Sequence, residues 1–311
     1  MPDADLDRGQ DTKPLSAEAS STDASSIDVR GRLDDELAGL DALELVVERR
    51  PSPGRRIWSA TWPKLAALVV SVGLWQAVVW SGWKPTYVLP GPGPVFGQLW
   101  QRLSDGTIIE AVGRTLSRAG MGFALATLIG GVIGLAVARS RLLRTAVGSL
   151  ITGLQTMPSI AWFPLAILLF QISESAILFV VVLGAAPSIA NGIIAGVDHV
   201  PPILDRVGTV LGARGLQRVR HVVLPAAMPQ VVAGLKQGWA FAWRSLMAGE
   251  LLVVIANQPS IGTQLQVARD FADAPWLLST MLVILFIGIL VDALFGAVER
   301  SMLRRRGLAL V

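Results

Sequence analysis

The sequence predicts an all-α membrane protein with about six transmembrane helices. Hydrophobic residues make up 52% of the 311 residues and charged residues only 16%, a balance typical of proteins that cross the membrane several times and not of globular enzymes. Long apolar runs alternate with short polar segments, and each run approaches the roughly 20 residues that span a bilayer. A chain of this length holds six such spans with short loops.

Several kinds of chemistry are excluded by residues that the sequence lacks. It has no cysteine, which excludes disulfides, thiolate nucleophiles and cysteine-bound metals, and its two histidines argue against a metal centre. It also has no Gly-x-x-x-x-Gly-Lys-Ser/Thr phosphate loop for binding ATP. We therefore expect no enzyme chemistry of these kinds, no cofactor and no metal. If ATP supplies energy to this chain, a separate subunit must bind it; otherwise the source is not ATP.

The first 56 residues differ from the rest of the chain. They are rich in Ser, Asp, Pro and Gly and hold thirteen acidic against eight basic residues, a composition that favours a largely disordered cytosolic tail. The acidic start without an apolar run after it is not a signal peptide. One short amphipathic helix is predicted inside the tail from apolar residues at helical spacing, and a transmembrane domain is expected at 57–311. The apolar residues are Leu33, Leu37, Leu40, Leu43 and Val47.

Tryptophan and proline mark the predicted spans. Trp62 and Trp83 bracket the first, and the helix between them covers about 30 Å, one hydrocarbon thickness. Residues 84–120 are broken by Pro and Gly and are predicted to form an external loop that leads into a surface helix. Pro158 and Pro164 interrupt the third span, which is tolerable only beside protein or a wet cavity, and a further break is expected near Pro187. The six spans are predicted at 65–80, 121–138, 146–170, 176–197, 231–255 and 276–298.

Basic residues gather at one set of span ends. An even number of spans places both termini on one side, together with the clusters at 49–64, 139–144, 200–225 and 300–306. Because cytoplasmic loops carry the excess of Lys and Arg, that side is expected to be the cytosol. We expect a multi-pass plasma membrane protein with both termini in the cytosol.

The segment 200–225 is the most distinctive polar stretch. Residues 205–211 have helical composition and stop at Gly212, where a residue without Cβ can take the positive φ that ends a helix. A second helix is predicted at 216–223, with Arg218 and His221 on one face, until Pro225 ends it. We interpret this as a helix-turn-helix at the membrane surface that a soluble partner grips, the alternative being a plain basic surface loop.

The spacing from Gly212 to Val222, Leu224 and Pro225 resembles the EAA signature of membrane subunits of ATP-binding-cassette (ABC) importers. Where that family has Glu-Ala-Ala, this chain has Arg-Val-Gly, with an acid one position early. We call 200–225 the coupling segment, because the resemblance implies that it enters a cleft on an ATPase subunit. The residues assigned to that contact are Asp205, Arg206, Gly212, Arg218, His221, Leu224 and Pro225.

The resemblance extends over residues 89–303 and looks like the branch of ABC permeases that serves sulfonates, taurine, nitrate and bicarbonate. It implies a type I importer fold, a homodimer, two cytosolic ATPases and an extracytoplasmic binding protein, with no nucleic acid. The chain shows no internal repeat, so we expect it to pair with a copy of itself or with a close relative to complete the path through the bilayer. An aliphatic sulfonate or taurine is the first expectation for the cargo. The alternatives are nitrate, bicarbonate or a heterocyclic nutrient and, from other classes, an ion-gradient-driven carrier or a membrane scaffold.

Charges inside spans are costly and therefore mark candidate functional residues. Arg244 falls near the middle of the fifth span, and Glu250 lies six residues later, about 120° away around the helix. Arg244 either lines the path of an oxyanion, which its planar fork suits, or forms an interhelical ion pair with an acid such as Glu250. Asp292 is expected to pair with the arginines at 300–306. Three further candidates for the substrate path lie near the proline-broken regions: Gln155, Trp162 and Asn191.

Overall fold

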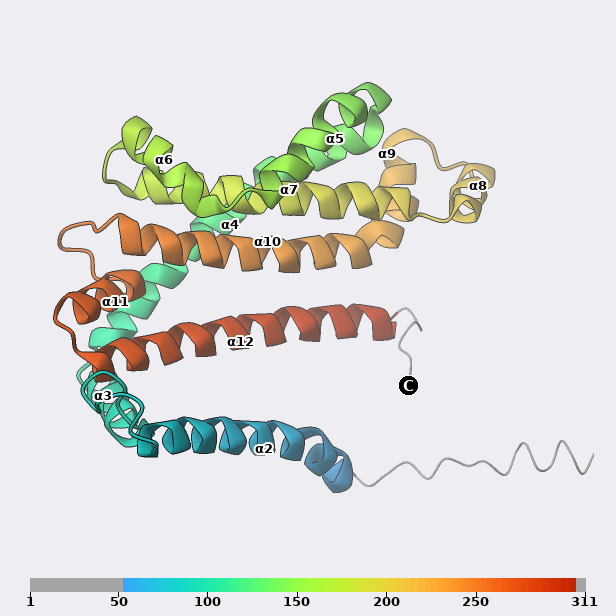
Figure 1. Ribbon diagram of the computed structural model, residues 1–311. Coiled ribbons are helices and arrows are strands. Elements are labelled where there is room, and N and C mark those ends of the chain that lie inside the picture. The colour runs from blue at the N-terminus through green and yellow to red at the C-terminus, as the bar shows by residue number, and fades with distance from the viewer. Residues whose placement is uncertain (1–52, 306–311) are drawn as a thin grey trace, which may run out of the picture. The chain divides into compact units, whose positions relative to one another are not determined.

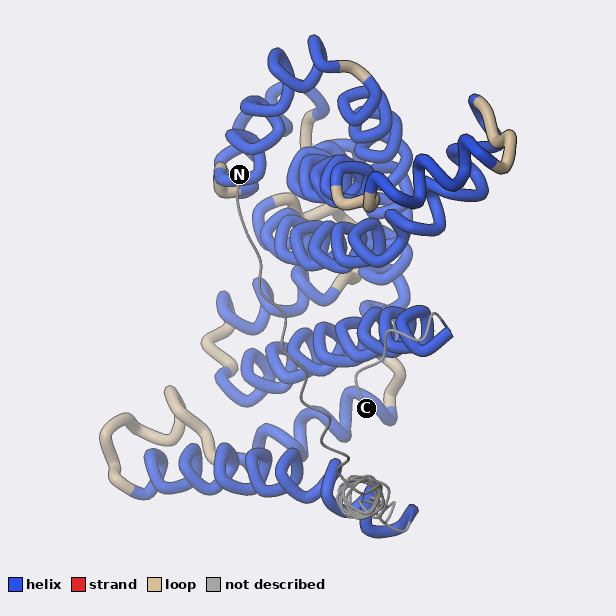
Figure 2. Tube along the Cα trace, turned by 90° about the vertical axis from the view of Figure 1, so that its right-hand side faces the viewer, coloured by secondary structure: helices blue, strands red, loops and turns tan. Residues whose placement is uncertain are grey.

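The computed structural model describes residues 53–305, and every regular element in that range is a helix (Figures 1 and 2). The predicted all-α class is therefore confirmed. The tail up to residue 52, with its predicted helix at 33–47, lies outside the described residues. Contacts divide the chain at Val70, within the first helix, and all helices after that one belong to the second unit.

The helices follow one another with short connections. Most are α-helices; η1 is a 3₁₀ turn and η2 a π-helical turn. In chain order they are α2 (Pro53–Trp80), α3 (Pro92–Ser104), α4 (Thr107–Arg139), α5 (Arg141–Thr156), η1 (Ser159–Trp162), α6 (Phe163–Phe170), α7 (Glu174–Asp198), α8 (Pro202–Val210), α9 (Gly215–Arg218), η2 (Val219–Val223), α10 (Leu224–Leu252), α11 (Ile261–Asp270) and α12 (Ala274–Arg305).

Four helices in the described part of the chain are long and apolar enough to cross a membrane. They are α2, α4, α7 and α12, and α5 with η1–α6 makes a fifth if this pair, bent by 102°, counts as one span. The bend confirms the interruption predicted from Pro158 and Pro164. Helix α10 is 29 residues long but carries Lys236, Arg244 and Glu250, and it does not reach the hydropathy of a span. Six spans therefore remain a prediction.

The second span begins earlier than the sequence indicated. Helix α4 starts at Thr107 and runs for 33 residues, so the external loop predicted for 84–120 is wrong in its second half. Its start is fixed by Asp105, whose carboxylate accepts hydrogen bonds from the backbone N–H and the hydroxyl of Thr107 at 2.9 and 2.7 Å. The backbone bond and then the hydroxyl bond favour the charged carboxylate and hold the pKa of Asp105 below its ordinary value.

Proline 187 does not break the fourth span. Helix α7 is continuous from Glu174 to Asp198, with Pro187 inside it and buried. Packing against neighbouring helices tolerates such a proline, and both α4 and α10 pack along α7. The predicted break there is wrong.

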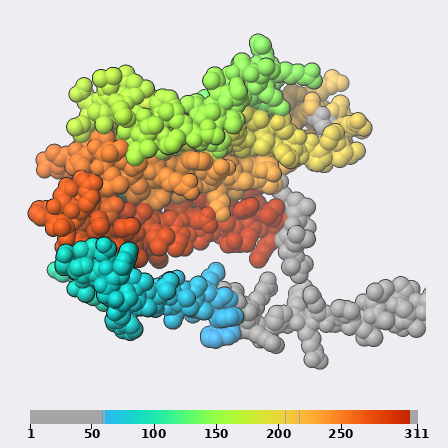
Figure 3. Space-filling view, viewed as in Figure 1, coloured from blue at the N-terminus to red at the C-terminus, as the bar shows by residue number. Residues whose placement is uncertain are grey.

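Small residues let α4, α7 and α10 approach closely. In the space-filling view the surface of α10 lies between those of α7 and α12 (Figure 3). A Cβ added to Gly192 of α7 would stand 2.5 Å from the Cα of Gly234 in α10, and one on Gly134 of α4 would stand 2.8 Å from the Ala190 carbonyl oxygen. Close backbone contact of this kind is how helices associate where the hydrophobic effect is absent.

Replacing Gly192 with alanine should force α7 and α10 apart. Because the added methyl meets backbone rather than a movable side chain, we expect a loss of about 1–3 kcal/mol, measured as thermal unfolding by tryptophan fluorescence in detergent. Gly113→Ala is the matched control, since nothing lies within 4 Å of its added Cβ, and it should leave stability equal or slightly higher. Equal melting of the two variants would contradict the packing account.

Candidate functional site

The coupling segment folds as two helical pieces joined at Gly212. Helix α8 ends in a Schellman motif: the Ala213 N–H donates to the Gly208 carbonyl at 2.9 Å and the Gly212 N–H to the Thr209 carbonyl at 3.0 Å. Gly212 has φ +81°, a conformation that a Cβ makes costly. The predicted stop at Gly212 is confirmed, although the helix starts at Pro202 rather than 205.

Proline 225 does not end the second piece. The chain runs from α9 through the π-turn η2 directly into α10, with Pro225 in the first turn of α10. In the π-turn the Leu224 N–H donates to the Val219 carbonyl, five residues back. This wider turn accommodates the proline ring, which in a regular helix clashes with the carbonyl four residues before it. The coupling segment is therefore continuous with a long helix of the core.

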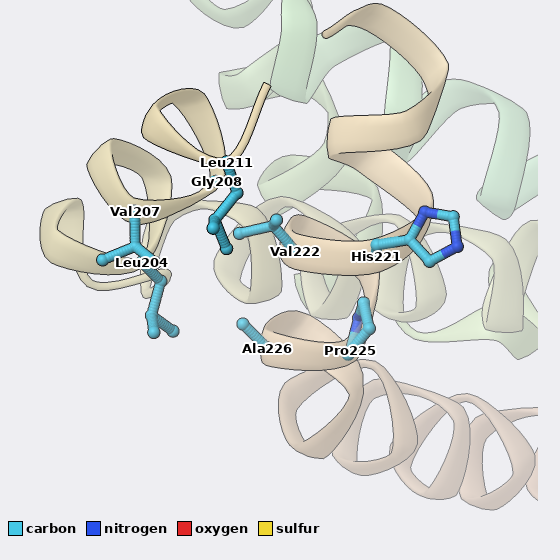
Figure 4. Close-up of a pocket in the computed structure, with 8 residues that line it drawn as sticks. All are labelled: Leu204, Val207, Gly208, Leu211, His221, Val222, Pro225 and Ala226. Atoms are coloured by element: carbon cyan, nitrogen blue, oxygen red, sulfur yellow. The ribbon is translucent and has the colours of Figure 1, made fainter. Parts of the chain in front are cut away.

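Helix α8 packs against η2 with an apolar hollow beside the contact. A Cβ on Gly208 would lie 2.8 Å from a methyl of Val222, so the glycine allows the two pieces to meet. Next to this contact lies a cavity of about 370 Å³ between α8 and the start of α10 (Figure 4). Leu204, Val207, Leu211 and Val222 line it, with Gly208, His221, Pro225 and Ala226. The coupling segment therefore has an apolar cavity on its surface in which a side chain of a partner protein can bind.

The predicted contact residues whose side chains the structure describes are all exposed. Arg206 and Arg218 are exposed, and His221 is exposed with its Nδ1 3.0 Å from the Gln217 carbonyl oxygen. The Asp205 side chain lies outside the described ones. Leu224 is half exposed at 49%, which keeps it available to a partner.

A buried ion network joins α4, α7 and α10. Glu250 is completely buried, and its carboxylate accepts from Arg118 Nη1 at 3.2 Å and from the Thr115 hydroxyl at 2.9 Å. Arg118, 4% exposed, also donates to Glu174 of α7 at 3.0 Å and to the side chain of Gln258. A buried charge is stable only when it is paired and hydrogen-bonded, and both conditions are met here.

The same network accepts hydrogen bonds from the backbone N–H groups at the start of α11. The Gly262 N–H donates to Glu250 Oε2 at 3.0 Å, and the Ile261 N–H donates to the Thr115 hydroxyl oxygen at 3.0 Å. Ser260 caps the next N–H, that of Thr263, at 3.2 Å. Because free N–H groups give a helix start its positive end, a carboxylate there is stabilised by the helix as well as by Arg118. Gly262 leaves no room for a side chain beside Glu250.

The structure separates Arg244 from Glu250. Arg244 is exposed, with its guanidinium 5.9 Å from the Phe241 ring centre, whereas Glu250 is buried against Arg118. The alternative in which Arg244 pairs with Glu250 is wrong within this chain. The pairing expected for Asp292 is wrong as well, because its carboxylate lies 2.9 Å from Lys236 of α10.

Two of the other pathway candidates lie together. Asn191 donates to Gln155 Oε1 at 2.6 Å, and Gln155 donates to the Ser188 hydroxyl at 3.0 Å, so they form a polar bridge between α5 and α7. Trp162 is partly buried and packs against the core cluster of α7 and α10. These contacts show how the side chains are held. Among the described residues no group of three or more His, Asp or Glu is placed to bind a metal.

Sequence reasoning missed Arg118, Thr115, Glu174 and Gln258. The external loop predicted around Arg118 hides it as a partner of Glu250. The helical spacing of Gly122 and Ala126 in the predicted span continues upstream of residue 121 through Thr115 and Ala111, and all four residues are buried in α4. That spacing places Thr115 and Arg118 on the buried side.

Long apolar helices, a proline-bent pair and a buried ion network between helices are features of a membrane protein that crosses the bilayer several times. The family described as binding-protein-dependent transport system inner membrane component matches residues 126–304. The chain belongs to this family, the membrane subunits of ABC importers.

The chain is similar to permeases that are named for several different cargos. A riboflavin transport system permease of Chloroflexus aurantiacus is 30% identical over 247 residues, 78% of this chain and 91% of that protein. A putative aliphatic sulfonates transport permease of Bacillus subtilis is 26% identical over 258 residues, covering 83% and 92%. Permeases named for taurine in Escherichia coli and for nitrate in Synechococcus elongatus are each 27% identical, over 78% and 67% of this chain. These matches support the sulfonate, taurine and nitrate branch.

Solved structures share the fold. The inward-facing MetNI methionine ABC transporter has a chain that matches 63% of this one and 96% of its own length, with a TM-score of 0.55 and 19% identity. At that identity the likeness concerns the fold alone.

Removing the Glu250 carboxylate should destabilise the protein strongly. Glu250→Ala leaves Arg118 buried without one of its two acids, and breaking such a pair costs about 3–5 kcal/mol. Thermal unfolding in detergent measures the effect. The matched control is Arg114→Gln, which removes the exposed pair with Glu110, 3.5 Å apart with side chains 44% and 60% exposed, and should cost under about 1 kcal/mol. A Glu250→Ala variant that melts with the control would refute the central role of the network.

Proposed function

We propose that this chain is the membrane subunit through which an ABC importer moves a small oxyanion, an aliphatic sulfonate or taurine, while a separate ATPase subunit bound to the coupling segment hydrolyses ATP. The observation that carries the proposal is the coupling segment itself: an exposed, basic helix-turn-helix around an apolar hollow, continuous with the core helix α10. A segment of this shape and charge suits a cleft on a soluble partner.

The geometry gives this segment a route for transmitting motion. Force on α8 reaches η2 through the contact of Gly208 with Val222, and η2 continues into α10 without a break. At the far end of α10, Glu250 is fixed to α4, α7 and the start of α11. Helix α10 can therefore act as a rigid lever between the ATPase and the opposite ends of the core helices, with the π-turn as the place where its angle changes.

The cargo assignment rests on Arg244. It is exposed on a helix of the membrane domain, and no described acid forms an ion pair with it. An unpaired guanidinium in a bilayer must face water or a partner, and its fork matches the oxygens of a sulfonate or nitrate. Gln155 and Asn191 are proposed as polar groups along the same path. Trp162 and Glu250 are proposed to stabilise the helices that line it.

Membership of this family supports a proposal for the assembly. One copy cannot enclose a path, so we propose a homodimer with two ATPases in the cytosol, where both termini of this chain lie, and an extracytoplasmic binding protein that delivers the cargo. The relative named for riboflavin supports a heterocyclic nutrient as second candidate, and nitrate or bicarbonate remains a third. Identifying the ligand of the partner binding protein separates these three. Membership of an ABC importer family argues against an ion-gradient-driven carrier and against a scaffold.

Replacing Gly212 should uncouple ATP hydrolysis from transport. Gly212→Val is strained at φ +81°, and a non-glycine residue there costs about 1–2 kcal/mol, which moves the end of α8. We expect normal insertion, lost uptake and weaker association with the ATPase. Gly212→Asn is the matched control, because Asn adopts positive φ readily, and it should keep most uptake. Normal uptake by the valine variant would contradict the role of the segment.

Changing Arg244 should alter transport without altering stability. Arg244→Ala should lose most uptake, while Arg244→Lys keeps part of it, because Lys retains the charge but not the planar fork. Since Arg244 is exposed and Glu250 is paired with Arg118, both variants should melt like the wild type. If Arg244→Ala lowers the melting temperature as well as uptake, and Arg244→Ala with Glu250→Ala restores both, the pathway role is wrong.

A further inference from the structure

A second cavity lies at the ends of α4 and α7. It has a volume of about 380 Å³ and is walled by α4, the end of α7 and the α9–η2 part of the coupling segment. Five apolar side chains line it, together with Gly215 and two arginines, Arg139 and Arg218. The apolar residues are Leu135, Ala138, Val197, Val219 and Val223. The cavity therefore combines an apolar lining with two arginine side chains.

Arg139 contributes a positive charge to this cavity. It makes no hydrogen bond or ion pair with any described residue, and Arg141 follows two positions later. Asp198, which follows the lining residue Val197, is engaged by Arg144 through bonds of 2.9 and 3.0 Å. An anion that reaches Arg139 therefore displaces no carboxylate of the described residues.

An apolar track leads to Arg139 along the outside of α4. Leu128, Val132 and Leu135 are 65%, 63% and 41% exposed, and with Arg139 they follow the i, i+4, i+7, i+11 spacing of one helix face. Helix α4 is about 50 Å long, well beyond the roughly 30 Å of hydrocarbon. Its Arg139 end therefore reaches the headgroup layer while the track lies among acyl chains.

We propose that this cavity is a binding site for an anionic phospholipid, with the phosphate held by Arg139 and Arg218 and an acyl chain lying along Leu135, Val132 and Leu128. A charge-bearing head on an apolar tail is the chemistry that matches both halves of the site, and basic pockets between membrane helices are known places for such headgroups. The site shares Arg218 with the coupling segment, so a bound lipid contacts the segment. The proposal does not depend on the identity of the cargo.

Lipid retention on the full-length chain tests this directly. The purified protein in detergent is given phosphatidylglycerol or phosphatidylcholine, and bound lipid is counted by native mass spectrometry. Wild type should retain phosphatidylglycerol in preference, and Arg139→Gln or Arg218→Gln should each weaken that retention about fivefold. Arg139→Lys should keep most of it. Arg269→Gln, an exposed arginine beside Asp270 on α11, is the control and should change nothing.

A second arm separates a lipid from other occupants. Val132→Asn leaves both arginines in place but interrupts the apolar track, so it should weaken phosphatidylglycerol retention, and excess inorganic phosphate should not displace the lipid. Unchanged retention in Arg139→Gln would overturn the proposal. So would displacement by inorganic phosphate with Val132→Asn behaving as wild type, which would indicate a free-phosphate site. Dissociation of a dimer in Arg139→Gln, with no lipid preference in the wild type, would instead assign this face to a second copy.

Discussion

The pairing of Glu250 with Arg118 is the constraint on which the rest of the structure depends. Neither charge is stable alone in a membrane domain, so α4 and α10 must meet at that level. The same carboxylate accepts the Gly262 N–H, which fixes where α11 starts. Arg118 reaches Glu174 as well, which ties in the start of α7. One buried carboxylate therefore sets the register of four helices at one end of the core.

The opposite end of α10 carries the coupling segment, so a single helix joins the network to the proposed ATPase contact. The close approach of Gly192 and Gly234 holds this helix against α7 along its middle. Because the two backbones are in direct contact, a displacement of α10 also displaces α7. The π-turn at Val219–Val223 lies between the exposed α8 and the packed part of α10. We propose that the angle of α10 changes at this turn while the packed part of the helix moves as a unit.

The sequence alone predicted the features that depend on local chemistry. Apolar runs gave the helical class, Gly212 gave the end of α8, and Pro158 gave the bend after α5. Features set by contacts between distant segments could not be predicted this way. Arg118 and Glu250 are 132 residues apart in the sequence. Without their distant partners, the polar residues around Arg118 indicate a loop rather than a buried helix. Pro187 and Pro225 indicated breaks, but neighbouring helices and a π-turn accommodate them.

We propose that this subunit moves its cargo only when a separate ATPase hydrolyses ATP. The most direct test is uptake of a labelled sulfonate into liposomes that contain the chain with its ATPase, with the binding protein outside and ATP supplied to the ATPase side. We expect uptake that requires ATP and both partners and that persists when ionophores abolish ion gradients. Uptake by the chain alone, driven by an ion gradient and indifferent to ATP, would contradict it.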